Sequence, residues 1–169
     1  MRRLALLALA LLGLSAGAPR ISAAQEVGLA IGTRAPVIQV EDLDGTAVNL
    51  GQFIGRKPVV MEFWAHWCTV CAELEPRLRA AEQRYGASVE FLTVAVGVNQ
   101  TVRSIRRHME DHDVPGRMLF DKDGRATRAY DAPATSYIVI LDRQGRVAYT
   151  GVGEDQNLAA ALARVTAAR

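Results

Sequence analysis

The sequence predicts an α/β fold in which helices flank a central mixed β-sheet, and three observations lead to this prediction. Apolar, strand-like runs alternate with segments of helical periodicity from residue 59 onwards. The last two strand-like runs are joined by Asp142-Arg143-Gln144-Gly145, a sequence typical of a hairpin turn. The chain has 169 residues, of which 50% are hydrophobic and 22% charged, and this suits one globular domain. Strands that alternate with helices before a closing hairpin favour an α/β sandwich.

The first residues are typical of a secretory signal peptide. Arg2 and Arg3 precede an apolar run from Leu4 to Leu14, and small residues follow that run. We expect residues 1–18 to form the signal peptide. An uncleaved N-terminal membrane anchor is the competing interpretation, but the apolar run is shorter than the ~20 residues that a spanning helix needs.

Cleavage would determine both the charge and the redox environment of the remaining chain. Cleavage after residue 24 is the alternative to cleavage after residue 18. We expect residues 19–34 to form a flexible lead-in and residues 35–169 to form the folded domain. Loss of the two leading arginines lowers Lys+Arg from 20 to 18, equal to the 18 Asp+Glu, so a nucleic-acid partner is not supported. Export would place the cysteines in the periplasm or another extracytoplasmic compartment, where disulfides persist.

Two short apolar runs open the domain and flank a turn sequence. Residues 38–40 and 47–50 lie on either side of Asp42-Leu43-Asp44-Gly45, whose residue types favour a turn. We therefore expect an N-terminal β-hairpin. Residues 59–64 predict a buried central strand, because apolar side chains would occupy both of its faces. Glu62 is the polar exception within that strand.

The remaining elements follow from periodicity. Helices are expected at 72–85, 100–112, 125–130 and 158–168, and strands at 89–96, 117–120, 137–141 and 147–150. Pro76 is expected to kink the first of these helices. In the second helix, Val102, Ile105 and Met109 share the predicted core face.

The chain's two cysteines, Cys68 and Cys71, provide the clearest chemical signal. They lie between an apolar strand and a helix pattern, so Cys68 is expected at a helix N-terminus. There the exposed backbone N–H groups and the helix dipole favour a thiolate. Cys71 lies one turn further on and could resolve a mixed disulfide. A structural bridge over so short a loop would stabilise little, so a redox function is favoured.

These motifs resemble the thioredoxin superfamily, and within it the extracytoplasmic TlpA/ResA-like branch. The resemblance extends from about Ile31 to the C-terminus. It rests on Gly32-Thr33-Arg34-Ala35-Pro36, on Phe63-Trp64-Ala65-His66-Trp67-Cys68-Thr69-Val70-Cys71, on Pro76, and on Ile140-Leu141-Asp142-x-x-Gly145. It implies a thioredoxin-like fold with an N-terminal β-hairpin extension. It also implies a protein-disulfide oxidoreductase with a redox-active centre and no cofactor or metal.

The same resemblance implies redox partners and a direction of electron transfer. The partners would be client proteins with thiols or disulfides, and an unidentified upstream redox partner, for which a membrane-embedded protein is one candidate. Reduction is the favoured direction, for example of an apocytochrome during cytochrome c maturation.

The resemblance further implies roles for individual residues. Cys68 would be the exposed nucleophile and Cys71 the buried resolving thiol, while Trp67 would cover the site and contact substrate. Glu62 matches a buried acid that the family places behind the second cysteine. A carboxyl group desolvated within a strand should have a raised pKa, so Glu62 could take the Cys71 proton. A glutamate that reaches solvent is the alternative.

Three features depart from the family pattern. Thr69-Val70 replaces the usual proline-containing pair between the cysteines, and these residues help to set the redox poise. Leu74 occupies the place of a glutamate in ResA-like members. Ser136 occupies the place of the cis-proline that normally faces the disulfide, unless a shifted register brings Pro133 there. A serine makes a trans peptide bond the default and adds a hydroxyl near the thiols.

The roles of the histidines and the function of the cysteine pair each have alternatives. His66 is expected to contact substrate, with modulation of Cys68 as the alternative. His108 and His112 have a spacing that can bind a metal ion, although neighbouring arginines favour a solvated helix face. A thiol peroxidase of the peroxiredoxin-like group is one alternative function. A copper-binding or delivery module that uses Cys68, Cys71 and His66 is another.

Overall fold

A seven-stranded mixed sheet forms the centre of the computed structural model, which describes residues 27–167. The predicted signal peptide and both cleavage sites lie outside the described residues. The strands are β1 Gln39–Glu41, β2 Ala47–Asn49, β3 Val59–Trp64, β4 Glu90–Val96, β5 Arg117–Asp121, β6 Tyr137–Leu141 and β7 Val147–Gly151. The helices are η1 Leu50–Gln52, α1 Thr69–Tyr85, α2 Val102–Asp111, α3 Arg125–Ala129 and α4 Leu158–Ala167.

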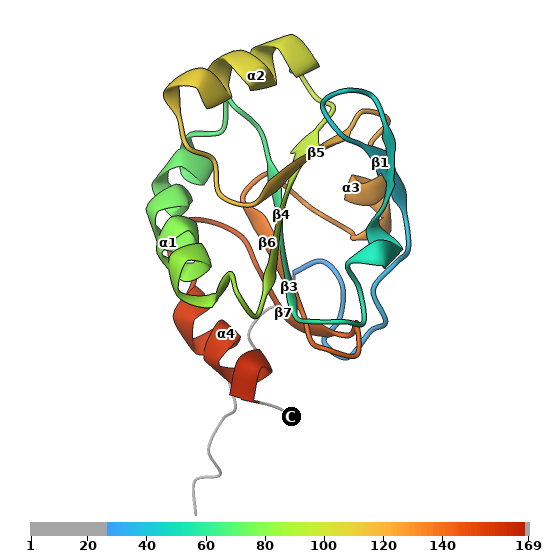
Figure 1. The fold of residues 1–169 in the computed structure, drawn as a ribbon, viewed down its shortest axis with the longest axis vertical. Helices are drawn as coiled ribbons and strands as arrows, with labels where there is room; N and C mark the ends of the chain where they lie inside the picture. The colour runs from blue at the N-terminus through green and yellow to red at the C-terminus, as the bar shows by residue number, and fades with distance from the viewer. Residues whose placement is uncertain (1–26, 168–169) are drawn as a thin grey trace, which may run out of the picture.

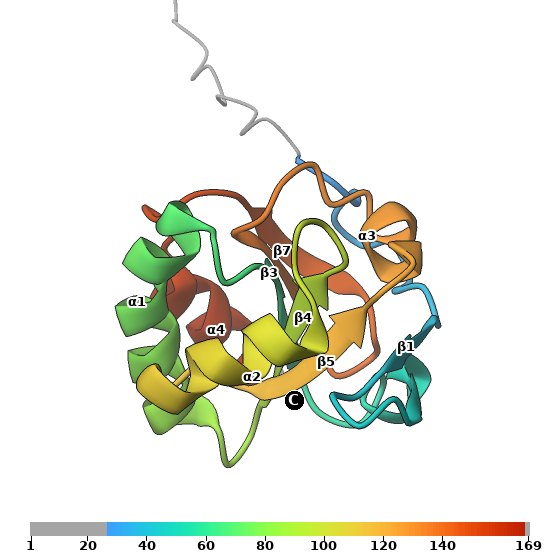
Figure 2. The same cartoon turned by 90° about the horizontal axis from the view of Figure 1, so that it is seen from above.

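The strand order is β2-β1-β5-β4-β3-β6-β7, and β3, β4 and β5 are mutually parallel. Parallel neighbours need crossover connections, which α1 and α2 provide. The hairpin β1–β2 and the strands β6 and β7 pair antiparallel with their neighbours. Helices α1 and α4 lie on one side of the sheet, while α3 lies on the other, next to the β1–β2 end of the sheet (Figures 1 and 2). The predicted mixed-sheet fold with its N-terminal hairpin is confirmed.

Successive residues of β3 enter two different parts of the core. Val60 belongs to a cluster with Leu74 and Leu78 of α1 and with residues of α4. Met61 and Phe63 belong to the larger cluster on the other side. This alternation is the two-residue period of a strand buried on both faces, and it places Glu62 on the same face as Val60, beneath α1.

Two helices differ from the sequence-based expectation. Helix α1 begins at Thr69 rather than at residue 72, because Cys68 caps it, and it continues through Pro76 to Tyr85. Helix α2 buries Ile105 completely, whereas Met109 is exposed. The prediction that Met109 lies on the core face is wrong, because the described core reaches only the first part of this helix.

The segment 27–34, predicted to belong to a flexible lead-in, is docked onto the domain. Gly32 donates its N–H to the Val147 carbonyl at 2.7 Å, and the Val147 N–H donates to Thr33 at 2.9 Å. The segment thus pairs with the backbone at the start of β7, which hydrophobic periodicity alone does not reveal. Among the described residues, no helix is both long enough and apolar enough to cross a bilayer.

Candidate active site

The two cysteines form a disulfide at the N-terminus of α1, with their Cα atoms 5.2 Å apart. Cys68 is the N-cap residue in an extended conformation, and its Sγ accepts a hydrogen bond from the Cys71 backbone N–H at 3.1 Å. An N-cap acceptor satisfies an N–H group that has no partner within the helix. After reduction, the same N–H and the helix dipole would stabilise negative charge on the Cys68 sulfur.

The two cysteines differ in access. Cys68 keeps 9% of its surface exposed and Cys71 only 1%. The family resemblance implies an exposed nucleophile, but in the disulfide form Cys68 is largely buried. Cys68 is nevertheless the more accessible of the pair, so an attacking thiolate would approach Cys68.

Trp67 and Val98 form an apolar surface beside the disulfide. Trp67 donates its indole N–H to the Val98 carbonyl at 2.9 Å, and the two residues are 44% and 57% exposed. This contact joins the loop before α1 to the loop after β4. Exposed aromatic and aliphatic side chains held by a hydrogen bond suit contact with another protein.

Gln100, which the sequence analysis did not single out, fixes these two loops from beneath. Its buried side-chain carbonyl accepts the His66 N–H at 3.1 Å, and its amide nitrogen donates to the carbonyls of Trp64 and Val96. A polar residue just after a buried strand gives too weak a sequence signal to identify such a role. Gln100 thereby ties the end of β3 to the end of β4.

Glu62 is almost completely buried between the sheet and α1, and its Oε1 has no hydrogen-bond partner among the described residues. Its neighbours on the adjacent strands are Thr93 and Ile138. Burial, and to a lesser degree the charge of Glu75, raises the pKa of Glu62 to about 8. The carboxyl group therefore does not reach solvent, and it is mostly protonated at neutral pH.

Ser136 immediately precedes β6 and lies beside the end of β3. Its backbone N–H donates to the Phe63 carbonyl at 2.8 Å, and its Oγ accepts the Gly153 N–H at 3.2 Å. The residue is buried with φ of 65°, and the described residues contain no cis peptide bond. Pro133 is exposed in the loop three positions earlier and makes no such contact with β3.

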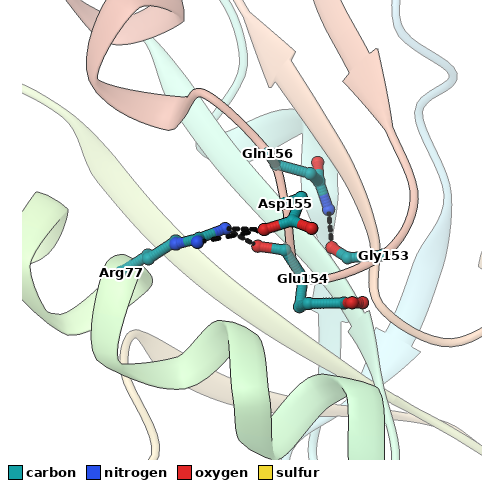
Figure 3. A network of polar contacts seen from close by, with 5 residues as sticks. All are labelled: Arg77, Gly153, Glu154, Asp155 and Gln156. Carbon is teal, nitrogen blue, oxygen red and sulfur yellow. Dashed lines mark hydrogen bonds and ion pairs between the residues drawn. The ribbon is translucent and has the colours of Figure 1, made fainter.

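A network of polar contacts joins Ser136 to α1 through the loop that precedes α4. Gln156 donates its side-chain amide to the carbonyls of Ser136 and Gly153, at 3.0 and 2.7 Å. Figure 3 shows the Arg77 guanidinium of α1 pointing toward the same loop, where it pairs with Asp155 at 3.1 Å. The pair is exposed and stabilises little, so the buried Gln156 contacts hold Ser136 more firmly.

The chain's three histidines lie together beside the cysteine loop. The ring of His108 lies 6.3 Å from that of His66, 4.2 Å from that of His112 and 5.2 Å from that of Trp64, between centroids. Burial, followed by the neighbouring His112 and His66, lowers the pKa of His108. Within residues 27–167, no three His, Cys, Asp or Glu side chains are arranged to hold a metal ion.

Comparison with known proteins places this geometry in a family. The Redoxin family model matches residues 30–165. Thiol-disulfide oxidoreductase ResA of Bacillus thuringiensis subsp. konkukian is 27% identical over 131 residues, which cover 77% of this chain and 74% of ResA. Thioredoxin-like protein YneN of Bacillus subtilis is 26% identical over 130 residues, covering 76% of this chain and 75% of YneN.

A solved structure with the same fold comes from Bacteroides vulgatus. It is the thioredoxin domain of a thiol-disulfide oxidoreductase, with a TM-score of 0.70 and 22% identity, and the match covers 81% of this chain and 99% of that domain. This likeness shows the fold alone. Together with the family match and the cysteine pair, it confirms the family expected from the sequence. The chain therefore belongs to the Redoxin family and is a ResA-like thiol–disulfide oxidoreductase of the thioredoxin superfamily.

Proposed function

We propose that this chain is an exported enzyme that reduces disulfides of client proteins, with Cys68 as nucleophile, Cys71 as resolving thiol and Glu62 as proton carrier. The observation that supports these roles most strongly is the placement of the Cys68 sulfur on the helix N-cap, where it accepts the Cys71 N–H. The more accessible cysteine is thus the one whose thiolate is stabilised.

Exchange would proceed in two balanced steps. The Cys68 thiolate attacks one sulfur of the client disulfide, so that a mixed disulfide forms and one client thiolate leaves and takes a proton from water. In molecules whose Glu62 is ionised, Cys71 then gives its proton to that carboxylate and attacks the Cys68 sulfur, which releases the second client thiolate. The client gains two electrons, and the enzyme is left with the disulfide seen in the structure. An upstream dithiol protein would return it to the dithiol form.

Glu62 suits the proton transfer because of its raised pKa. A pKa of about 8 lies close to the ordinary thiol value of about 8.5, so proton exchange between Cys71 and Glu62 would be nearly balanced. The carboxyl group lies on the sheet face covered by α1, whose first buried side chains are Cys71 and Leu74. When the group is ionised, its Oε1, which has no hydrogen-bond partner in the described part of the chain, could accept a proton.

The cellular compartment of the enzyme, the direction of electron transfer and the kind of client protein are inferred from the sequence. The charged start and short apolar run of the N-terminus support export to the periplasm or an equivalent compartment, with cleavage near residue 18. Resemblance to the TlpA/ResA-like branch supports reduction of a client such as an apocytochrome. Trp67 and His66 would contact the client around the disulfide, whereas Ser136 is buried and would join them only if its loop opened.

Trapping of the mixed disulfide tests this mechanism directly. Reduced Cys71→Ser protein, which retains the nucleophile but lacks the resolving thiol, should form a stable covalent adduct with a disulfide-containing client such as insulin. Cys68→Ser protein should form none and should lose insulin reduction. An adduct through Cys71 in the Cys68→Ser variant would contradict the assignment, and rapid peroxide consumption by the reduced wild type would favour the thiol peroxidase alternative.

A further inference from the structure

A groove of about 430 Å³ runs along α2 beside the loop that leads into the disulfide. Residues of α2 form most of its wall, and His66, Thr101 and His112 complete it. His66 directly precedes Trp67, so the groove adjoins the apolar surface of Trp67 and Val98. A protein segment that reaches Cys68 across that surface would therefore pass next to this groove.

The charged side chains of the groove are Arg103, Arg107 and Asp111, which follow one another at helical spacing of four residues. The ion pairs formed among the described residues involve neither Arg103 nor Arg107. In contrast, Arg106 of the same helix is paired with Asp44. Within residues 27–167, the groove thus presents two exposed guanidinium groups that form no ion pair.

His108 does not add to this charge at neutral pH. His108 lies between the rings of Trp64 and His112, and burial is the main reason that its pKa is lowered. Arg103 and Arg107 carry a positive charge that is independent of pH in the ordinary range. Arginine presents a planar fork of donors that matches a carboxylate, so a groove of this kind recognises acidic side chains.

We propose that the α2 groove with Arg103 and Arg107 binds acidic side chains of a client protein, next to the cysteine that is attacked. The proposal rests on the proposed function, because it names a feature of the client that Cys68 reduces. A client segment is favoured over an anionic lipid surface because the groove adjoins Trp67 beside the redox pair. The cysteines react with the thiols or disulfides of a protein, whereas a lipid headgroup offers them no reaction.

The test uses three disulfide-linked peptides that differ only in the residues flanking the cysteine: glutamate, glutamine or lysine. The full-length protein is reduced, and kcat/KM for peptide reduction is measured at low and at high salt. Two exposed charge pairs should favour the glutamate peptide over the glutamine peptide by roughly threefold to tenfold at low salt. The preference should disappear at high salt because exposed charges are screened.

Substitution of the two groove arginines tests whether they cause the preference for the glutamate peptide. Arg103→Gln with Arg107→Gln should reduce the glutamine peptide like the wild type but lose the preference for glutamate. Arg103→Glu with Arg107→Glu should prefer the lysine peptide. Arg143→Gln, an exposed arginine in the β6–β7 turn, is the matched control and should retain the preference.

Three results would overturn the proposal. Equal kcat/KM for the glutamate and glutamine peptides in the wild type would do so, as would a preference that survives in the double glutamine variant. Absence of a peptide preference together with arginine-dependent binding to phosphatidylglycerol vesicles would assign the groove to a membrane instead. Exchange without a charge preference leaves the proposed function intact, whereas absence of exchange with every peptide overturns both.

Discussion

Ser136 donates its backbone N–H to the Phe63 carbonyl at 2.8 Å while it holds a left-handed backbone conformation with φ of 65°. A non-glycine residue rarely adopts this conformation, and its persistence here is explained by the buried contacts that surround it. Gln156 binds the Ser136 carbonyl and Gly153 binds its hydroxyl, so every polar group of Ser136 has a partner. The position where the family resemblance implies a proline is therefore built around the N–H group and backbone of a serine.

Ser136→Pro should destabilise the oxidised protein, although it introduces the residue that the resemblance expects. Proline fixes φ near −65° and has no N–H, so it fits neither the left-handed conformation nor the bond to Phe63. We expect a loss of about 3 kcal/mol or more in the free energy of unfolding, measured in urea. Ser136→Gly, which tolerates a positive φ, should lose much less. A proline variant as stable as the wild type would contradict the described backbone.

Glu62 should make the protein less stable as the pH rises. Its pKa of about 8 in the folded state lies above the ordinary value of 4.5, so the folded state binds this proton more tightly. Below about pH 4.5 both states hold the proton, and Glu62 adds no pH-dependent cost. Between about pH 4.5 and pH 8 the unfolded state ionises first, and stability is lost at up to about 1.4 kcal/mol per pH unit.

The free energy of unfolding of the oxidised wild type and of Glu62→Gln, compared from pH 5 to pH 8, isolates this contribution. The difference between the two proteins should shift by a few kcal/mol in favour of the variant as the pH rises. Glu73→Gln, which removes an exposed carboxylate on α1, is the control and should parallel the wild type. Parallel curves for Glu62→Gln and the wild type would show that this carboxyl group is not desolvated.

Gln100→Leu should loosen the loops that hold Trp67. The substitution leaves the His66 N–H and the Trp64 carbonyl without their buried partner, and an unsatisfied buried group costs about 1–3 kcal/mol. We expect a lower unfolding temperature and a higher KM for a client, with the reduction potential little changed because the cysteines and their cap remain. Thr101→Val, which removes the neighbouring α2 cap, should lower stability without raising KM to the same extent.

Residues with local signals could be predicted from the sequence, and residues held by distant contacts could not. The β3 strand and the cysteine pair follow from adjacent residues: an apolar run on both strand faces and a motif at a helix start. Gln100 contacts backbone groups in two separate strands, and no periodicity encodes such a contact. The left-handed Ser136 likewise depends on the loop around Gln156, which arrives twenty positions later in the chain.

Helix α2 shows a second limit of prediction. Its periodicity correctly indicated a helical face with Ile105, but periodicity does not say how far the sheet beneath the helix extends. Met109 is exposed for that reason. The lead-in segment shows the same limit, because its bonds to Val147 are made by backbone atoms, which side-chain patterns do not report.

The reduction potential of the Cys68–Cys71 pair at pH 7 tests the central claim most directly. It is measured by equilibration with glutathione or dithiothreitol buffers, with the oxidised fraction read from thiol alkylation. A client reductant should have a strongly negative potential, near the value of about −270 mV for thioredoxin. A potential near about −120 mV, as in the oxidant DsbA, would contradict a reductant and reverse the direction proposed for this enzyme.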